Sequence, residues 1–267
     1  MRHTVTTLQH GPQRLGSAFI AWLAGWRRVF FFGALAMVMV LSRSTYDRTN
    51  RATIARQIHI TTWQILPWFT LLSALISLVL IRIVVVTAFN YGLSQFALEM
   101  VVRVLVLELI PLVAALFVTL RCALAVNPGV DGIYIPRDLG GLGGMETERI
   151  RDELVPRVIA YAFSVLTMAV VSSLVALVLA YTGVYGLSPW GLANYTRTVG
   201  QVFDLTVSLG FVLKTLLFSL AVAVIPIAAS IDRAGLPPEA DAVQPGTVRL
   251  FLALVLIEGL SLAVKYI

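Results

Sequence analysis

The stretch from Glu99 to Arg121, EMVVRVLVLELIPLVAALFVTLR, constrains the fold more than any other part of the chain. It is long enough to cross a bilayer as a helix, yet Glu99, Arg103 and Glu108 lie within its apolar run. A charge inside a spanning helix costs about 2.5 kcal/mol or more, so such groups usually face a protein interior or a wet cavity. The chain is therefore expected to build a helical bundle around this segment.

The spacing of these charges predicts their environment. Glu99 and Arg103 are four residues apart, on one helix face, and we expect a local ion pair near the membrane surface. Pro111 follows Glu108 by three residues and removes one backbone hydrogen bond, which permits a kink beside the acid.

The composition predicts an integral membrane protein. Of the 267 residues, 58% are hydrophobic and only 13% are charged, which is more apolar sequence than a soluble domain needs. The net charge of +6 could indicate nucleic-acid binding. However, eight of the twenty Lys and Arg residues lie in the first 64 positions, beside an aromatic-rich amphipathic stretch. That distribution is typical of a cytoplasmic segment facing a membrane, so we expect no nucleic-acid partner.

The N-terminal region, residues 1–64, is expected to be cytoplasmic or interfacial. Within residues 13–42, Trp22, Trp26 and the pair Arg27 and Arg28 divide the apolar run, and the remainder is too short to span comfortably. An interfacial or re-entrant helix is the preferred interpretation. A true spanning helix is the alternative, and it would invert the topology of everything that follows.

Residues 65–267 are predicted to form one all-α transmembrane domain of five helices. The expected spans are approximately 65–89, 96–126, 158–181, 205–229 and 247–267. Lys and Arg concentrate in the N-terminal region, the polar segment 127–157 and residues 230–249, whereas the opposite loops hold only Arg197. By the positive-inside rule, the N-terminus is cytoplasmic and the C-terminus external. A short surface helix is expected in the external loop 182–203.

Three charges are predicted inside the membrane on three different spans: Glu108, Lys214 and Glu258. Because an unpaired charge in hydrocarbon is costly, we expect these side chains to approach one another in the bundle. Two roles explain this pattern equally well. The charges form a static ion pair that fixes the helix register, or they take part in transport.

Several kinds of chemistry have no sequence motif here. The chain has no G-x-x-x-x-G-K-[ST] phosphate loop and no G-x-S-x-G elbow, and its histidines are scattered. We therefore expect no catalytic residue, no metal site and no cofactor on this chain. A transporter of this composition takes its energy from a partner or works passively.

Several motifs, in order along the chain, resemble a known family. ELIPLVAALFVTLR (108–121) resembles the E-L-G-P-V-x-T-A-L-x-x-x-G-R signature of the MlaE/YrbE permeases. Weaker matches follow at PRVIA (156–160), LKTLLFS (213–219), PGTVRLFL (245–252) and LIEGLSLAVKYI (256–267). The resemblance covers about residues 60–267, and Pro111, Arg121, Pro156 and Arg157 are motif positions within it.

The resemblance implies five transmembrane helices preceded by an N-terminal elbow helix, in a homodimeric ABC-transporter permease of the bacterial inner membrane. It implies phospholipid as cargo. It also implies an ATP-binding cassette ATPase, an MCE-domain periplasmic protein and a small STAS-type regulatory subunit as partners. In this family, polar membrane residues correspond to Glu108, Lys214 and Glu258, and the ATPase docks on the cytoplasmic segment 127–157.

The chain also departs from the family pattern. Leu107 stands where the family usually has Arg. The segment on which the ATPase would dock, 127–157, does not match the family's sequence patterns. Its four glycines, at 140, 141, 143 and 144, weaken a docking helix by up to about 1 kcal/mol each. Its candidate docking residues are Arg137, Leu139, Leu142 and Met145, of which the last three have regular apolar spacing.

Two alternatives to a lipid permease remain open from the sequence. The first is a non-transporting membrane scaffold or assembly subunit, which the divergent coupling segment would suit. The second is an ion-coupled carrier that uses Glu99, Glu108 and Glu258. The second lacks the internal repeats and paired broken helices typical of such carriers.

Overall fold

The computed structural model describes residues 10–42, 46, 48–124, 150–233 and 245–266. Within these residues every regular element is a helix. In chain order they are α1 (His10–Leu41), α2 (Arg48–Ile58), η2 (His59–Trp63), α3 (Leu66–Asn90), η3 (Ser94–Phe96), α4 (Ala97–Val101), η4 (Val102–Leu109), α5 (Ile110–Leu124), η6 (Ile150–Leu154), α7 (Val155–Tyr185), η7 (Pro189–Gly191), α8 (Leu192–Val202), α9 (Leu205–Arg233) and α10 (Pro245–Tyr266).

Five helical segments of the described chain are long and apolar enough to cross a membrane, as predicted. They are Asn50–Asn90, Ser94–Arg121, Asp152–Tyr185, Leu205–Ala229 and Gly246–Lys265. The first is longer than expected at its N-terminal end, and the third is longer than expected at both ends. The all-α membrane fold predicted from the sequence is confirmed.

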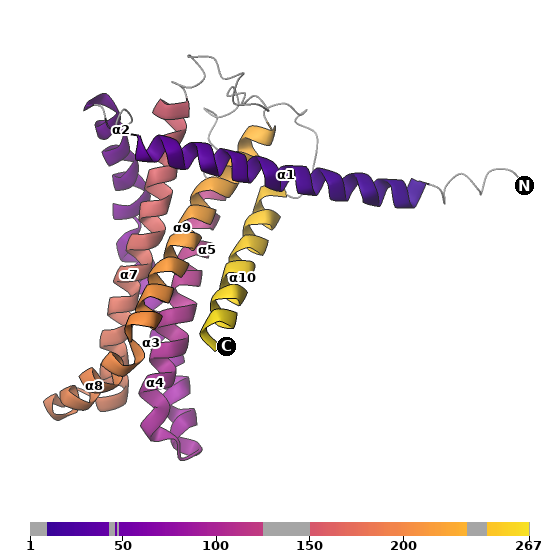
Figure 1. The fold of residues 1–267 in the computed structure, drawn as a ribbon. Coiled ribbons are helices and arrows are strands. Elements are labelled where there is room, and N and C mark those ends of the chain that lie inside the picture. Colours follow the sequence, from indigo (N-terminus) through magenta and orange to yellow (C-terminus); the bar gives the residue numbers. More distant parts are fainter. Residues whose placement is uncertain (1–9, 43–45, 47, 125–149, 234–244, 267) are drawn as a thin grey trace, which may run out of the picture.

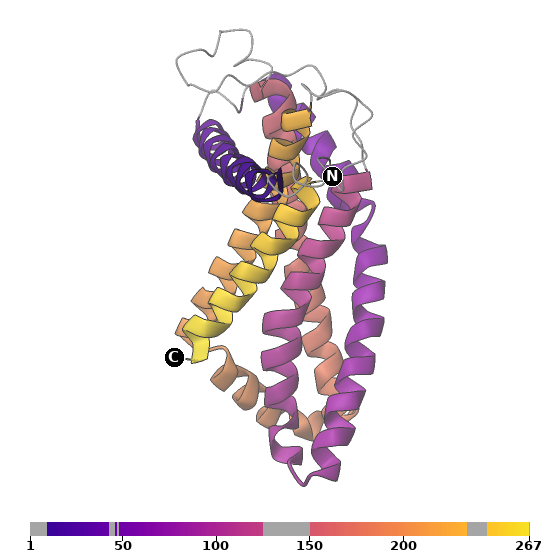
Figure 2. The same ribbon diagram turned by 90° about the vertical axis from the view of Figure 1, so that its right-hand side faces the viewer.

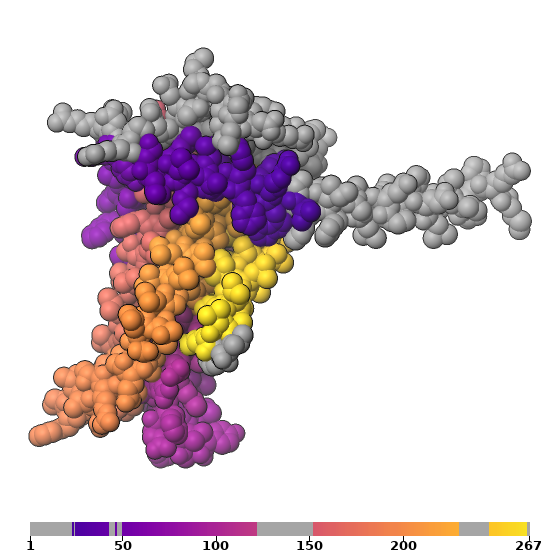
Figure 3. Space-filling view, in the orientation of Figure 1, coloured from indigo at the N-terminus to yellow at the C-terminus, as the bar shows by residue number. Residues whose placement is uncertain are grey.

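Helix α1 lies crosswise over one end of the bundle, where it covers the ends of α9 and α10 (Figures 1 and 3). Its buried face carries Val29, Phe32 and Ala36, whereas Phe30 and Val38 on other faces are exposed. The helix therefore has the amphipathic character expected of an interfacial element. This placement confirms the preferred interpretation of residues 13–42 over a spanning helix.

Close packing of α1 on the bundle depends on small residues. A side chain at Gly33 would put its first carbon 3.2 Å from Val224 Cγ1 on α9, and one at Gly25 would overlap the Arg249 guanidinium on α10. Since the two glycines are eight residues apart, they lie on the same side of the helix. A larger residue at Gly33 would press against Val224, whereas one at Gly25 would displace the end of the flexible Arg249 side chain.

The opposite end of the bundle carries the expected short surface helix, α8, and the tight turn between α3 and α4 (Figure 1). Gly92 has φ 70° in this turn, a conformation that favours glycine. Helix α10 runs alongside α9 and ends well short of this turn in both views (Figures 1 and 2). The N-terminal part of α9, toward the α8 end of the molecule, exposes Leu205 and Leu209.

Candidate functional site

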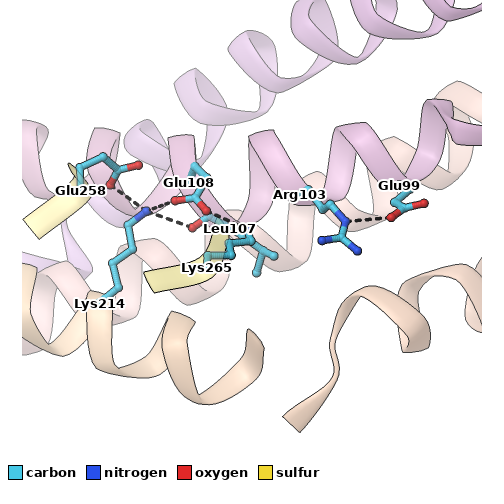
Figure 4. Close-up of polar contacts among 7 residues, drawn as sticks. All are labelled: Glu99, Arg103, Leu107, Glu108, Lys214, Glu258 and Lys265. Atoms are coloured by element: carbon cyan, nitrogen blue, oxygen red, sulfur yellow. Dashed lines mark hydrogen bonds and ion pairs between the residues drawn. The ribbon is translucent and has the colours of Figure 1, made fainter. Parts of the chain in front are cut away.

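Four charged side chains meet where η4, α9 and α10 come together (Figure 4). Lys214 Nζ, from α9, contacts Glu108 Oε2, from η4, and lies 2.7 Å from Glu258 Oε2, from α10. Lys265, in the last turn of α10, places its Nζ 2.8 Å from Glu108 Oε1. The structure thus brings Glu108, Lys214 and Glu258 together and adds a second lysine to them.

The backbone beside Glu108 departs from a regular α-helix. Residues Val102–Leu109 form a π-helix, η4, which ends just before Pro111 in the first turn of α5. Proline has no N–H to donate to the carbonyl four residues earlier, which is that of Leu107. Lys214 Nζ donates to this Leu107 carbonyl oxygen at 3.4 Å. This part of the second span therefore presents both a carbonyl and a carboxylate to Lys214.

Lys214 is the most enclosed member of the cluster. Its side chain is 2% exposed, against 15% for Glu108 and 17% for Glu258. Its Nζ also lies 5.7 Å from the ring centroid of Phe218, one turn further along α9, which is within the range of a cation–π interaction. A buried ammonium group is tolerated because carboxylates, a carbonyl and an aromatic face replace its water.

Lys265 is the functional candidate that sequence reasoning missed. It follows Glu258 by seven residues, which is two helical turns and therefore the same face of α10. That spacing was the available signal. The contact with Glu108, 157 positions earlier, could not be seen without the arrangement of the helices.

The other predicted pair stands apart from this cluster. Arg103 Nε donates to Glu99 Oε1 at 2.9 Å, and the two side chains are 38% and 37% exposed. Figure 4 shows this pair further along the same helical segment, away from Lys214. Glu99 and Arg103 therefore form the expected local pair.

A cavity of about 250 Å³ adjoins the cluster. Glu108, Lys214 and Lys265 form its charged wall, while Thr206 and Ser261 add hydroxyl groups. Most of the remaining lining is apolar and comes from α9 and α10: Val207, Phe211, Leu213, Leu217, Ile257, Leu260 and Val264. Such a site can hold a small charged or zwitterionic group at one side and hydrocarbon at the other.

The motif residues outside the cluster have structural surroundings. Pro156 is buried in the first turn of α7, where proline is well tolerated, and Arg157 follows it there. Arg121 Nη2, near the end of α5, donates to the Ile60 carbonyl in η2 at 3.5 Å. Arg121 thus connects η2 to the second span through this hydrogen bond.

The predicted docking residues Arg137, Leu139, Leu142 and Met145 lie outside the described residues. Among the residues that are described, no group of three or more His, Cys, Asp or Glu side chains is arranged to hold a metal ion.

Comparison with protein families gives a match over most of the chain. The family model described as Permease MlaE matches residues 54–264, from within α2 to the last turn of α10. The match therefore reaches all five candidate spans and includes the whole charged cluster except Lys265. No curated protein matches the chain.

Proposed function

The chain belongs to the MlaE permease family, the membrane subunits of lipid ABC transporters, and from this premise we propose that it moves phospholipid between the membrane it spans and an MCE-domain partner. ATP hydrolysis takes place on a separate ATPase subunit, so this chain is a transport subunit with no catalytic residue and no cofactor of its own.

The observation that carries this proposal is the cavity beside the charged cluster. It combines an apolar lining with Glu108, Lys214 and Lys265 at one wall, and leucines of this lining such as Leu213 and Leu260 are exposed. Amphiphiles need both kinds of surface, one for the head group and one for the acyl chains.

The partners and topology follow from the family and the charge distribution. The polar segment 127–157 faces the cytoplasm and docks the ATPase through Arg137, Leu139, Leu142 and Met145. The α8 end faces the periplasm and the MCE-domain protein, with the C-terminus on that side of the bacterial inner membrane. A second copy of the chain completes the permease, and a small STAS-type subunit joins the complex on the cytoplasmic side.

Purification from the native host in nanodiscs tests the proposal. Mass spectrometry is expected to find an ATPase, an MCE-domain protein and phospholipid bound to the chain. A chain that is purified without nucleotide-binding subunit and without lipid would contradict the proposal and favour a membrane scaffold.

A pair of variants tests the docking segment. Replacing Leu142 and Met145 by Asp should remove the ATPase from the complex, because charged side chains cannot be buried against an apolar docking groove. Leu187→Asp is the matched control, since Leu187 is 90% exposed at the α8 end. ATPase retained by the double variant would exclude this docking surface.

A further inference from the structure

We propose that the Lys265–Glu108 pair is the head-group site for a zwitterionic phospholipid, in which the lipid phosphate binds Lys265 and the lipid ammonium group binds Glu108. The inference rests on the proposed function and deepens it, because it names the class of phospholipid that the cavity accepts.

Both members of this pair reach the cavity wall. Lys265 and Glu108 line the cavity of about 250 Å³, and their Nζ and Oε1 atoms are 2.8 Å apart. Ser261, one turn before Lys265 on α10, lines it too and can donate a hydrogen bond to a phosphate oxygen. The exposed side chains of Leu260 and Val264 flank this face of α10 and offer a surface for acyl chains.

The two lysines of the cluster differ in how firmly they are held. Lys214 is 2% exposed and lies between two carboxylates, so its removal would leave both acids without their central cation. Lys265 is 16% exposed and meets the other oxygen of Glu108. If Lys265 leaves Glu108 to bind a ligand phosphate, the contact between Glu108 Oε2 and Lys214 remains. Lys265 is therefore the cation that can be exchanged.

The charge balance selects a zwitterion. Two lysines and two glutamates give the cluster a formal charge of zero. A ligand that brings one phosphate and one ammonium group replaces the Lys265–Glu108 contact by two new contacts of the same kind and keeps the balance. A lipid with net negative charge would place its phosphate beside Glu108 with no added cation, which is unfavourable at low dielectric constant.

Competition between two lipids tests this inference. The purified full-length chain is equilibrated with an equimolar mixture of phosphatidylethanolamine and phosphatidylglycerol of identical acyl chains, and bound lipid is counted by native mass spectrometry. We expect phosphatidylethanolamine to be enriched about tenfold, the effect of one charge-assisted hydrogen bond. Glu108→Gln should abolish the enrichment, because it removes the partner of the lipid ammonium group, whereas Lys265→Arg should retain it.

Glu99→Gln is the matched control, because Glu99 is a partly exposed acid in the same span as Glu108 and does not line the cavity. Equal binding of the two lipids by the wild type, or an enrichment that survives Glu108→Gln, would overturn the inference and leave lipid binding itself intact. Absence of any bound lipid in the wild type would overturn the proposed function as well. The wild-type ratio decides the question even where Glu108→Gln fails to fold.

Discussion

Lys214 Nζ on α9 lies 2.7 Å from Glu258 Oε2 on α10, and the same ammonium group contacts Glu108 in η4. One cation therefore compensates two carboxylates and connects the second, fourth and fifth candidate spans. All three side chains are mostly buried in an apolar bundle, so the contribution of each charge depends on the presence of the others.

Lys214→Met is expected to destabilise the protein strongly. The substitution leaves Glu108 and Glu258 facing each other without their central cation, and breaking a buried ion pair from one side costs about 3–5 kcal/mol. Unfolding in detergent micelles, followed by circular dichroism, measures the loss. A variant as stable as the wild type would show that water compensates the two acids.

Removing one acid together with the lysine should recover part of that loss. In the double variant Lys214→Met, Glu258→Gln, the remaining pair is Lys265 with Glu108, so the cluster is again neutral. We expect the double variant to lose less unfolding free energy than the two single variants lose together. The difference should be about 0.5–3 kcal/mol, the range for residues in contact. Strict additivity in this double-mutant cycle would contradict a coupled cluster.

The pair Glu99 and Arg103 provides a contrast within the same span. Its nitrogen and oxygen are 2.9 Å apart, as close as those of the cluster, but both side chains are more than one third exposed. Exposed pairs contribute less than about 1 kcal/mol, so Arg103→Gln should change the unfolding free energy little. A loss as large as that of Lys214→Met would place this pair in a low-dielectric interior.

Local patterns predicted most of the fold and part of the site. Apolar length gave the five spans, and the paired arginines 27 and 28 indicated that α1 does not cross the membrane. Intramembrane charge identified Glu108, Lys214 and Glu258 before any contact was known. Two features needed the folded structure. The π-helix at Val102–Leu109 has a sequence that also suits an α-helix, and Lys265 meets Glu108 only because α10 ends beside η4.

Alkaline pH should weaken the α8 end of the molecule. Burial raises the pKa of the Tyr195 phenol, whose oxygen donates to the Leu177 carbonyl at 2.9 Å. The folded state thus favours the neutral form, so this contribution is complete below pH about 10 and is lost as the pH rises through the raised pKa. Between neutral and alkaline pH, the unfolding temperature of Tyr195→Phe should fall less than that of the wild type. Tyr91→Phe, at an exposed tyrosine, is the control, and equal curves for all three proteins would contradict this assignment.

Two glycines of α10 should respond oppositely to alanine. Gly246 is buried in the first turn, where an added carbon would overlap Ala229 Cβ on α9, whereas Gly259 has open space on the same helix. Overpacking costs about 1–3 kcal/mol, so Gly246→Ala should lower the unfolding temperature by forcing α9 and α10 apart. Gly259→Ala should leave it unchanged or raise it, since alanine favours a helix interior by about 0.5–1 kcal/mol relative to glycine. Helix propensity disfavours alanine at neither position, so it cannot explain a loss of stability at Gly246. Equal effects would show that α10 does not pack closely on α9 at Ala229.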